Sequence, residues 1–151
     1  MFFDKEILIL NQEVMNSKEI ITLLANKLEK QGIVKDDFLT HTLERETKFP
    51  TGLETKGLGV AIPHTDSKYV NKSQIAFATL KRPVDFKSMV DLDKDVSVSL
   101  VFMIAMSTPH EQAGLLSKLM GLFQDPEELE KLRICKTKEE IMEILQKHQI
   151  N

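Results

Sequence analysis

A histidine follows a short strand-like pattern in residues 59–66, which read GVAIPHTD. The small and β-branched residues at 60–62 are typical of a buried strand, and Pro63 cannot continue it because proline has no N–H to donate. We therefore expect His64 on a stiffened turn at the edge of a sheet, where side chains of open α/β folds meet their ligands. A neutral imidazole in such a place can act as a covalent nucleophile, for example toward a phosphoryl group. Taken alone, the pattern also fits a histidine at a strand end that has no role.

A second motif, STPHE at residues 107–111, predicts the start of a helix. Thr108 and Glu111 have the spacing of a capping box, and Pro109 falls at the first helical position, where its missing N–H costs nothing. His110 is therefore expected in the first helical turn, close to unpaired N–H groups and the positive end of the helix dipole. This helix end favours a bound anion, and its field keeps a nearby imidazole neutral, although Glu111 opposes that field.

His64 and His110 can serve one site. The strands expected before them end at Ile62 and Ala105, and parallel neighbouring strands would bring both histidines to the same edge of the sheet. Arg45, at the end of an expected helix, would add a fixed positive charge there. Two imidazoles, a guanidinium and a helix N-terminus suit a phosphoryl group, whose transfer depends mainly on positioning and charge stabilisation. The sequence contains no glycine-rich Walker loop, which favours a phosphoprotein over a nucleotide as the donor. We expect no cofactor and no metal.

In these stretches the chain resembles the enzyme IIA components of the bacterial sugar phosphotransferase system, in the fructose–mannitol superfamily (type 2). The similarity spans nearly the whole chain. The matching segments are, in order, ERE at 44–46, TG at 51–52, GVAIPH at 59–64, VFMIA at 101–105, His110 and LLSKL at 115–119. The resemblance implies that His64 is the phosphorylated residue, through Nε2, and that His110 and Arg45 support the phosphate.

The resemblance also implies a phosphocarrier function. Phospho-HPr would donate the phosphoryl group to His64, and a cysteine of the cognate IIB protein would accept it, so that the membrane component IIC is met only indirectly. A second interpretation is a regulatory module, like the nitrogen-related IIA paralogues, in which the phosphorylation state controls protein partners. A third is a metal site built from His64, Asp66 and His110, since imidazoles and a carboxylate suit zinc, but no local ligand spacing supports it.

Two features separate this chain from the commoner members that it resembles. Residues 54–56 are extra before Gly57, and the dipeptide 65–66, Thr-Asp, follows the histidine where glycine is usual. The segments 45–52 and 93–101 look most like galactitol-type IIA proteins. We therefore expect a system that transports a sugar or polyol, with galactitol as the leading candidate.

Hydrophobic periodicity indicates the elements that must hold these residues. The order is strand, two helices, about three strands and three helices, which predicts an α/β fold: a three-layer α/β/α sandwich with a mixed sheet of about four or five strands, in a single domain over 1–151. Expected strands cover 6–10, 60–62, 74–80 and 96–104, with an interruption at 81–83 and a polar loop from there through Asp95. In the last strand, one face is expected to hold Val96, Val98, Leu100, Phe102 and Ile104. Expected helices cover 17–31, 36–47, 109–123, 126–132 and 138–147.

Composition limits the class of protein. The net charge of −3, without a basic cluster, argues against nucleic acid as a partner, and no apolar run is long enough to span a bilayer. The first residues lack the features of a signal peptide, so we expect a cytoplasmic protein. The single cysteine, Cys135, excludes an internal disulfide and is expected to pack against the core. His41 and His148 are expected on solvated helix faces without a role.

Overall fold

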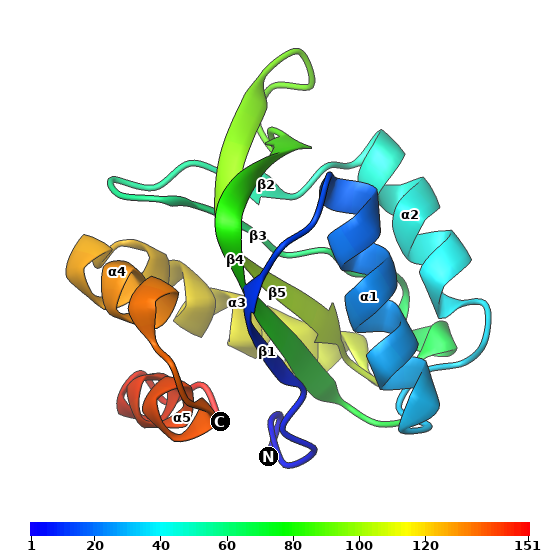
Figure 1. Ribbon diagram of the computed structural model, residues 1–151. Helices are drawn as coiled ribbons and strands as arrows, with labels where there is room; N and C mark the ends of the chain where they lie inside the picture. Colours follow the sequence, from blue (N-terminus) through cyan, green and yellow to red (C-terminus); the bar gives the residue numbers. More distant parts are fainter.

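Five strands form a mixed sheet in the order β1-β4-β5-β3-β2 in the computed structural model, which describes residues 1–151 (Figure 1). The strands are β1 (Leu8–Gln12), β2 (Gly52–Leu53), β3 (Gly59–Ala61), β4 (Gln74–Lys87) and β5 (Asp95–Ala105). The central pair β4–β5 is antiparallel, β1 and β3 run parallel to their inner neighbours, and β2 runs antiparallel to β3. The predicted mixed sheet is therefore confirmed, with β2 as a strand that the sequence analysis missed.

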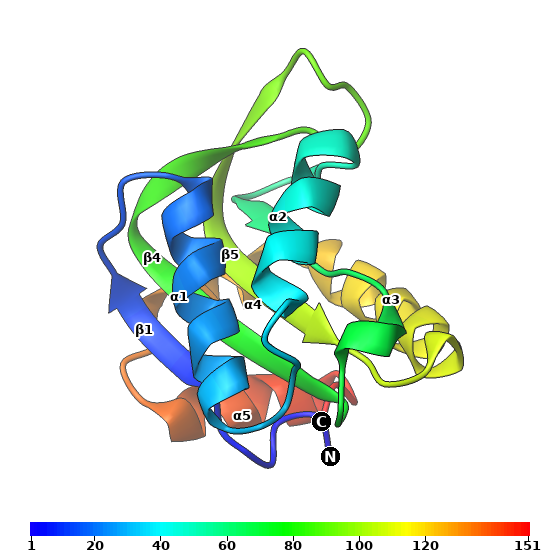
Figure 2. The same ribbon diagram turned by 90° about the vertical axis from the view of Figure 1, so that its right-hand side faces the viewer.

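Helices cover both faces of the sheet. One face packs against α1 (Ser17–Lys30) and α2 (Phe38–Lys48), which lie in front of the strands in Figure 2. The other face packs against α3 (Pro109–Phe123), α4 (Pro126–Ile134) and α5 (Lys138–Lys147). Two separate apolar cores result, and the predicted three-layer α/β/α sandwich is confirmed. None of the five helices combines the length and the apolar character that a membrane span requires.

The central strands differ from prediction in two ways, both caused by extra residues. β4 changes register at the expected interruption, between Thr79 and Val84, but continues as a strand to Lys87, so the loop predicted from there begins only afterwards. β5 has Ser99 as an extra residue relative to β3, since consecutive residues of β3 pair with Val98 and Leu100. The predicted single apolar face is therefore wrong. Val96 and Val98 face the α1–α2 layer, whereas Leu100, Phe102 and Ile104 face the α3–α5 layer.

The first strand begins two residues later than predicted. Glu6 adopts a left-handed backbone conformation, with φ of 48°, and donates its N–H to the carbonyl of Phe3 at 2.9 Å. A residue in this conformation belongs to a turn and not to a strand. β1 therefore starts at Leu8 instead of Glu6.

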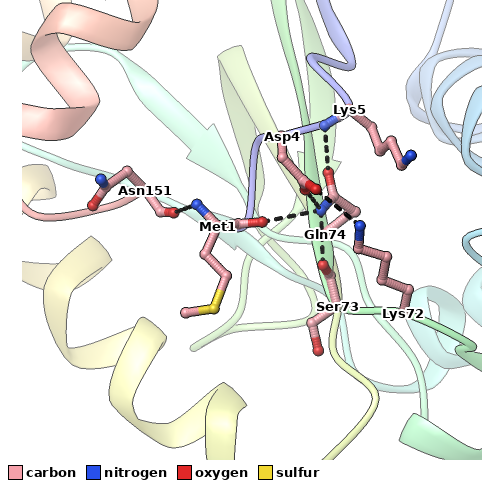
Figure 3. Close-up of polar contacts among 7 residues, drawn as sticks. All are labelled: Met1, Asp4, Lys5, Lys72, Ser73, Gln74 and Asn151. Atoms are coloured by element: carbon pink, nitrogen blue, oxygen red, sulfur yellow. Dashed lines mark hydrogen bonds and ion pairs between the residues drawn. The ribbon is translucent and has the colours of Figure 1, made fainter.

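The buried side chain of Gln74, at the start of β4, holds the N-terminal segment (Figure 3). Its amide oxygen accepts from the N–H of Lys5 at 3.2 Å, and its NH₂ group donates to the carbonyl of Met1 at 3.1 Å. Asp4, which also contacts this amide, pairs with Lys72 at 2.8 Å. Beside this cluster, the N–H of Phe2 donates to the carbonyl of Asn151 at 2.8 Å, so the two ends of the chain lie side by side.

Helices α4 and α5 are joined by a nearly buried carboxylate. The Oε1 atom of Glu128 lies 2.8 Å from Nζ of Lys147 and 3.2 Å from Nε2 of His148, and its Oε2 atom lies 3.3 Å from Nζ of Lys131. The hydrogen bond from Lys147, followed by those from His148 and Lys131, lowers the pKa of Glu128 to about 2. The expectation that His148 is simply solvated is wrong, because the folded chain brings it against this carboxylate.

His41 is likewise not a solvated residue. Its ring is half-buried and stacks on the ring of Tyr69, with centroids 4.1 Å apart and an interplanar angle of 16°. This contact packs α2 against the short turn that follows His64. Cys135 is buried as expected, and burial raises the pKa of its thiol.

Candidate functional site

His64 lies at the carboxyl end of β3, beside the carboxyl end of β5. The two strands are parallel neighbours, with Ala61 opposite Val101, which is the arrangement on which the predicted pairing of the two histidines depended. After β3, the carbonyl of Pro63 accepts the N–H of Ile104 at 3.0 Å, which fixes the turn against β5. The turn is therefore anchored to the central part of the sheet, and the His64 side chain is half-buried at its edge.

The tautomer of His64 follows from one hydrogen bond. Nδ1 lies 2.8 Å from the carbonyl oxygen of Ile62. A carbonyl oxygen can only accept, so Nδ1 carries the proton and Nε2 carries the lone pair. The nucleophilic atom of this imidazole is therefore Nε2.

The surroundings of His64 keep the ring neutral. Burial lowers its pKa below the usual value of 6.5, and the positive charge of Arg45 lowers it further, while the hydrogen bond to Ile62 and the charge of Asp66 act in the opposite direction. The net direction is down. At neutral pH the imidazole is therefore uncharged and its Nε2 lone pair is free.

Arg45, in the last turn of α2, lines two adjoining hollows together with His64. Its guanidinium lies 5.5 Å from the ring centroid of Phe49, an aromatic side chain that is 63% exposed. The Nε atom of Arg45 is buried and has no hydrogen-bond partner. A buried donor of this kind requires an explanation, and an anion bound between the guanidinium and the imidazole would provide one.

The N-terminal turn of α3 borders the same site, as predicted. Thr108 caps the helix by accepting the N–H of Glu111 at 3.5 Å, and Pro109 and Gln112 line the hollow that contains His64 and Arg45. His110 is exposed on this turn and lines neither hollow. The structure thus brings His64 and Arg45 together with the helix end, and the supporting role of His110 stays a prediction.

Residues that the sequence analysis did not single out complete the hollows. One hollow is shared with Gln112, which lies on the same helical face as Pro109 because it is three positions later, a spacing that could have identified it. The other extends to the loop between β4 and β5, and includes Met89, Val90 and Leu92. These three side chains are exposed and apolar, and no local pattern places that loop next to His64.

The alternative metal site is not assembled. His64, Asp66 and His110 do not bring ligand atoms together. The three side chains of ligand type within 4.8 Å of one another are Asp125, Glu128 and His148. Because two lysines already neutralise Glu128, we interpret that cluster as an ion-pair contact between helices.

Comparison with known proteins identifies the family. Residues 1–148 match the model of the family described as phosphoenolpyruvate-dependent sugar phosphotransferase system, EIIA 2. The chain belongs to this family. The resemblance inferred from the sequence is confirmed, and this EIIA protein is a component of a phosphotransferase system.

Two curated proteins and one solved structure show the range of its relatives. This EIIA protein is 32% identical over 118 residues to the galactitol-specific EIIA component of the phosphotransferase system of Escherichia coli (strain K12), which covers 78% of each chain. It is 35% identical over 127 residues to the transcriptional regulator ManR of Bacillus subtilis (strain 168), which covers 82% of this chain and 18% of ManR. A solved complex of mannitol enzyme IIA with phosphorylated mannitol enzyme IIB from Escherichia coli matches its fold, with a TM-score of 0.77 at 24% identity over 94% of this chain and 95% of that chain.

Proposed function

We propose that this EIIA protein is a phosphocarrier whose His64 accepts a phosphoryl group from phospho-HPr and passes it to a cysteine of a cognate IIB protein. The transfer would support uptake and phosphorylation of a sugar or polyol, with galactitol as the leading candidate because of the galactitol-specific relative. The membrane component IIC would be met only through IIB, and the protein would work in the cytoplasm.

The observation that carries this proposal is the state of the His64 ring. A neutral imidazole with Nδ1–H bound to Ile62 leaves the lone pair of Nε2 free, and the ring lines the hollows that it shares with Arg45. In the first step, this lone pair forms the bond to phosphorus while the bond to the donor breaks and its electron pair leaves with the donor. In the second step, a thiolate of IIB attacks phosphorus and the electron pair of the P–N bond returns to Nε2.

Arg45 would stabilise the charge on the phosphoryl oxygens in both steps. The charge of the transferring group is spread over its equatorial oxygens, so a fixed guanidinium beside the acceptor nitrogen lowers the barrier in each direction. Its unpartnered buried Nε is a donor available for this purpose. The N-terminal turn of α3, which borders the same hollow, contributes the positive end of a helix dipole.

Radiolabelled phosphoenolpyruvate, enzyme I and HPr test the first step. We expect acid-labile, base-stable label on the wild-type protein and none on a His64→Ala variant that keeps its fold. Adding a galactitol-type IIB should then move the label to a cysteine of that protein. Label on the alanine variant would refute the assignment of His64.

A regulatory function is the second candidate, because the chain is also similar to a segment of a transcriptional regulator. The two candidates differ in the fate of the phosphoryl group. A phosphocarrier loses its label to IIB within the assay, whereas a regulatory protein keeps the label and changes its protein partners.

A further inference from the structure

We propose that Glu46 and Thr51 are positioning residues for His64 and act on it through the main chain of Ile62. The part of this proposal that concerns transfer rates rests on the proposed function of His64. The part that concerns the orientation of the imidazole does not.

Glu46 and Thr51 join the end of α2 to the strand β2. Glu46 follows Arg45 in the chain, and its carboxylate accepts the N–H of Thr51 at 2.8 Å and the hydroxyl of Thr51 at 2.9 Å. Thr51 is 2% exposed and Glu46 is half-buried, so both contacts are partly shielded from water. Burial raises the pKa of Glu46, while its bonds from Thr51 stabilise the ionised form. The helix turn that carries Arg45 is thus tied directly to the residue in front of β2.

The Thr51 hydroxyl is oriented by this carboxylate. A hydroxyl has one proton, and the carboxylate can only accept, so the proton points to Glu46 and the oxygen lone pairs remain for another donor. That donor is the N–H of Ile62, which lies 3.2 Å from Oγ1 of Thr51. The last backbone pair of β2 and β3 is Gly52 with Ala61, so the threonine side chain adds one more contact to the ladder.

Ile62 is also the residue that fixes the His64 ring. Its carbonyl accepts Nδ1–H at 2.8 Å, and the next carbonyl, that of Pro63, accepts the N–H of Ile104 at 3.0 Å. The segment 62–63 is therefore held by Thr51 on one side and by β5 on the other. If Thr51 releases the N–H of Ile62, the carbonyl of the same residue can rotate away from Nδ1. The ring can then adopt the tautomer that carries its proton on Nε2. In that tautomer Nε2 has no free lone pair and cannot act as the nucleophile.

The Thr51→Val variant tests this link, because valine keeps the shape and removes the hydroxyl. NMR of nitrogen-labelled histidine distinguishes a protonated ring nitrogen from one with a lone pair, and it needs no phosphoryl transfer. We expect the share of the tautomer with its proton on Nε2 to rise in Thr51→Val, and phosphoryl acceptance to slow about tenfold. Thr51→Ser, which restores the hydroxyl, should return both readouts close to the wild-type values.

Two further variants make the result specific. Thr47→Val is the matched control, because Thr47 lies in the same helix turn and its exposed hydroxyl bonds only to the carbonyl of Leu43 at 3.0 Å. Glu46→Gln keeps the size of the side chain, but it removes the negative charge and replaces one of the two accepting oxygens with an NH₂ group that only donates, so the bonds from Thr51 are weakened. It should therefore shift the tautomer in the same direction as Thr51→Val, and it decides the question if that variant does not fold.

A folded Thr51→Val protein with the wild-type tautomer balance would overturn the proposal, as would an equal effect of Thr47→Val. If the wild-type protein accepts no label from phospho-HPr, the proposed function fails, and the NMR readout still decides whether Thr51 positions the ring.

Discussion

His64 donates its Nδ1–H to the carbonyl of Ile62, two residues earlier, across 2.8 Å. The phosphorylated protein should therefore carry its phosphate on Nε2, because a bond at Nδ1 would first require loss of this hydrogen bond. Phosphorus NMR of the labelled protein separates the two isomers of phosphohistidine. A majority of the Nδ1 isomer would contradict the tautomer described here.

Arg45 and His64 are coupled by charge. The guanidinium disfavours the imidazolium form, so Arg45→Gln should raise the pKa of His64. Since the neutral ring is the acceptor, the fall of the acceptance rate with decreasing pH should then begin at a higher pH than in the wild type. Proton NMR titration of the His64 ring measures the shift, and Arg82→Gln, which changes an exposed arginine paired with Glu13, is the control.

Arg45→Lys separates charge from geometry. Lysine keeps the positive charge, so the pKa of His64 should stay near the wild-type value, but it loses the planar fork that fits phosphate oxygens. We expect phosphoryl acceptance to slow by about 10²-fold, in the range found for removal of one charge-stabilising donor. A normal rate would show that only the charge matters.

His110 is exposed beside the site, and its support of the phosphate is testable by half-reaction. His110→Ala should still accept the phosphoryl group and should pass it to IIB more slowly, by about 10²-fold, because a second imidazole would stabilise the charge in transit. Gln112→Ala is the comparison, since Gln112 lines the hollow itself. Normal rates of both half-reactions in His110→Ala would remove this residue from the site.

Glu128 should make the free energy of unfolding depend on pH in the acid range. Its pKa of about 2 lies below the usual 4.5, so its contribution is complete above pH 4.5 and is lost as the pH falls toward 2. We expect Glu128→Gln to cost on the order of 1 kcal/mol at neutral pH, because the partner lysines remain largely hydrated. In urea unfolding at a series of pH values, the free energies of unfolding of the wild type and of Glu128→Gln should converge in acid. Glu127→Gln, an exposed change in the same helix, should show no such convergence.

Partner choice should follow the galactitol-type segments. We expect general HPr to phosphorylate the protein normally, while onward transfer occurs to a galactitol-type IIB and not to mannitol or fructose IIB proteins, because mismatched charge and shape exclude the wrong acceptors. A panel of IIB proteins incubated with the labelled protein measures this directly. Indiscriminate transfer would contradict the subgroup and leave the family unaffected.

Local patterns predicted the parts of the site that depend on local chemistry. Pro63 ends the strand before His64, and Thr108 with Pro109 starts α3 at the predicted residue, because capping and proline effects act within a few residues. The parallel pairing of β3 with β5 could be stated only as a condition, since it depends on residues about forty positions apart. The same reason explains why the link from Glu46 through Thr51 to Ile62 was missed. The three residues lie in three separate matching segments, and no local pattern predicts that their side chains and main chain meet.

The errors have the same physical origin. The extra residue Ser99 in β5 reverses which face the valines before it occupy, and an alternating pattern of apolar residues looks the same with or without that reversal. His41 and His148 lie in polar helical segments, as solvated residues do, yet their partners Tyr69 and Glu128 come from other elements. The spacing of apolar and polar residues along a helix does not indicate a partner from another element.

The contact between Phe2 and Asn151 has an architectural consequence. Since residues 1 and 151 lie side by side, a longer polypeptide can enter and leave this domain at one point of its surface without threading through either helical layer. The domain can therefore be carried as an insert in larger proteins at little cost to its own packing. The matched segment makes up only 18% of the regulator ManR, so a sequence similar to this domain does occur within a longer chain.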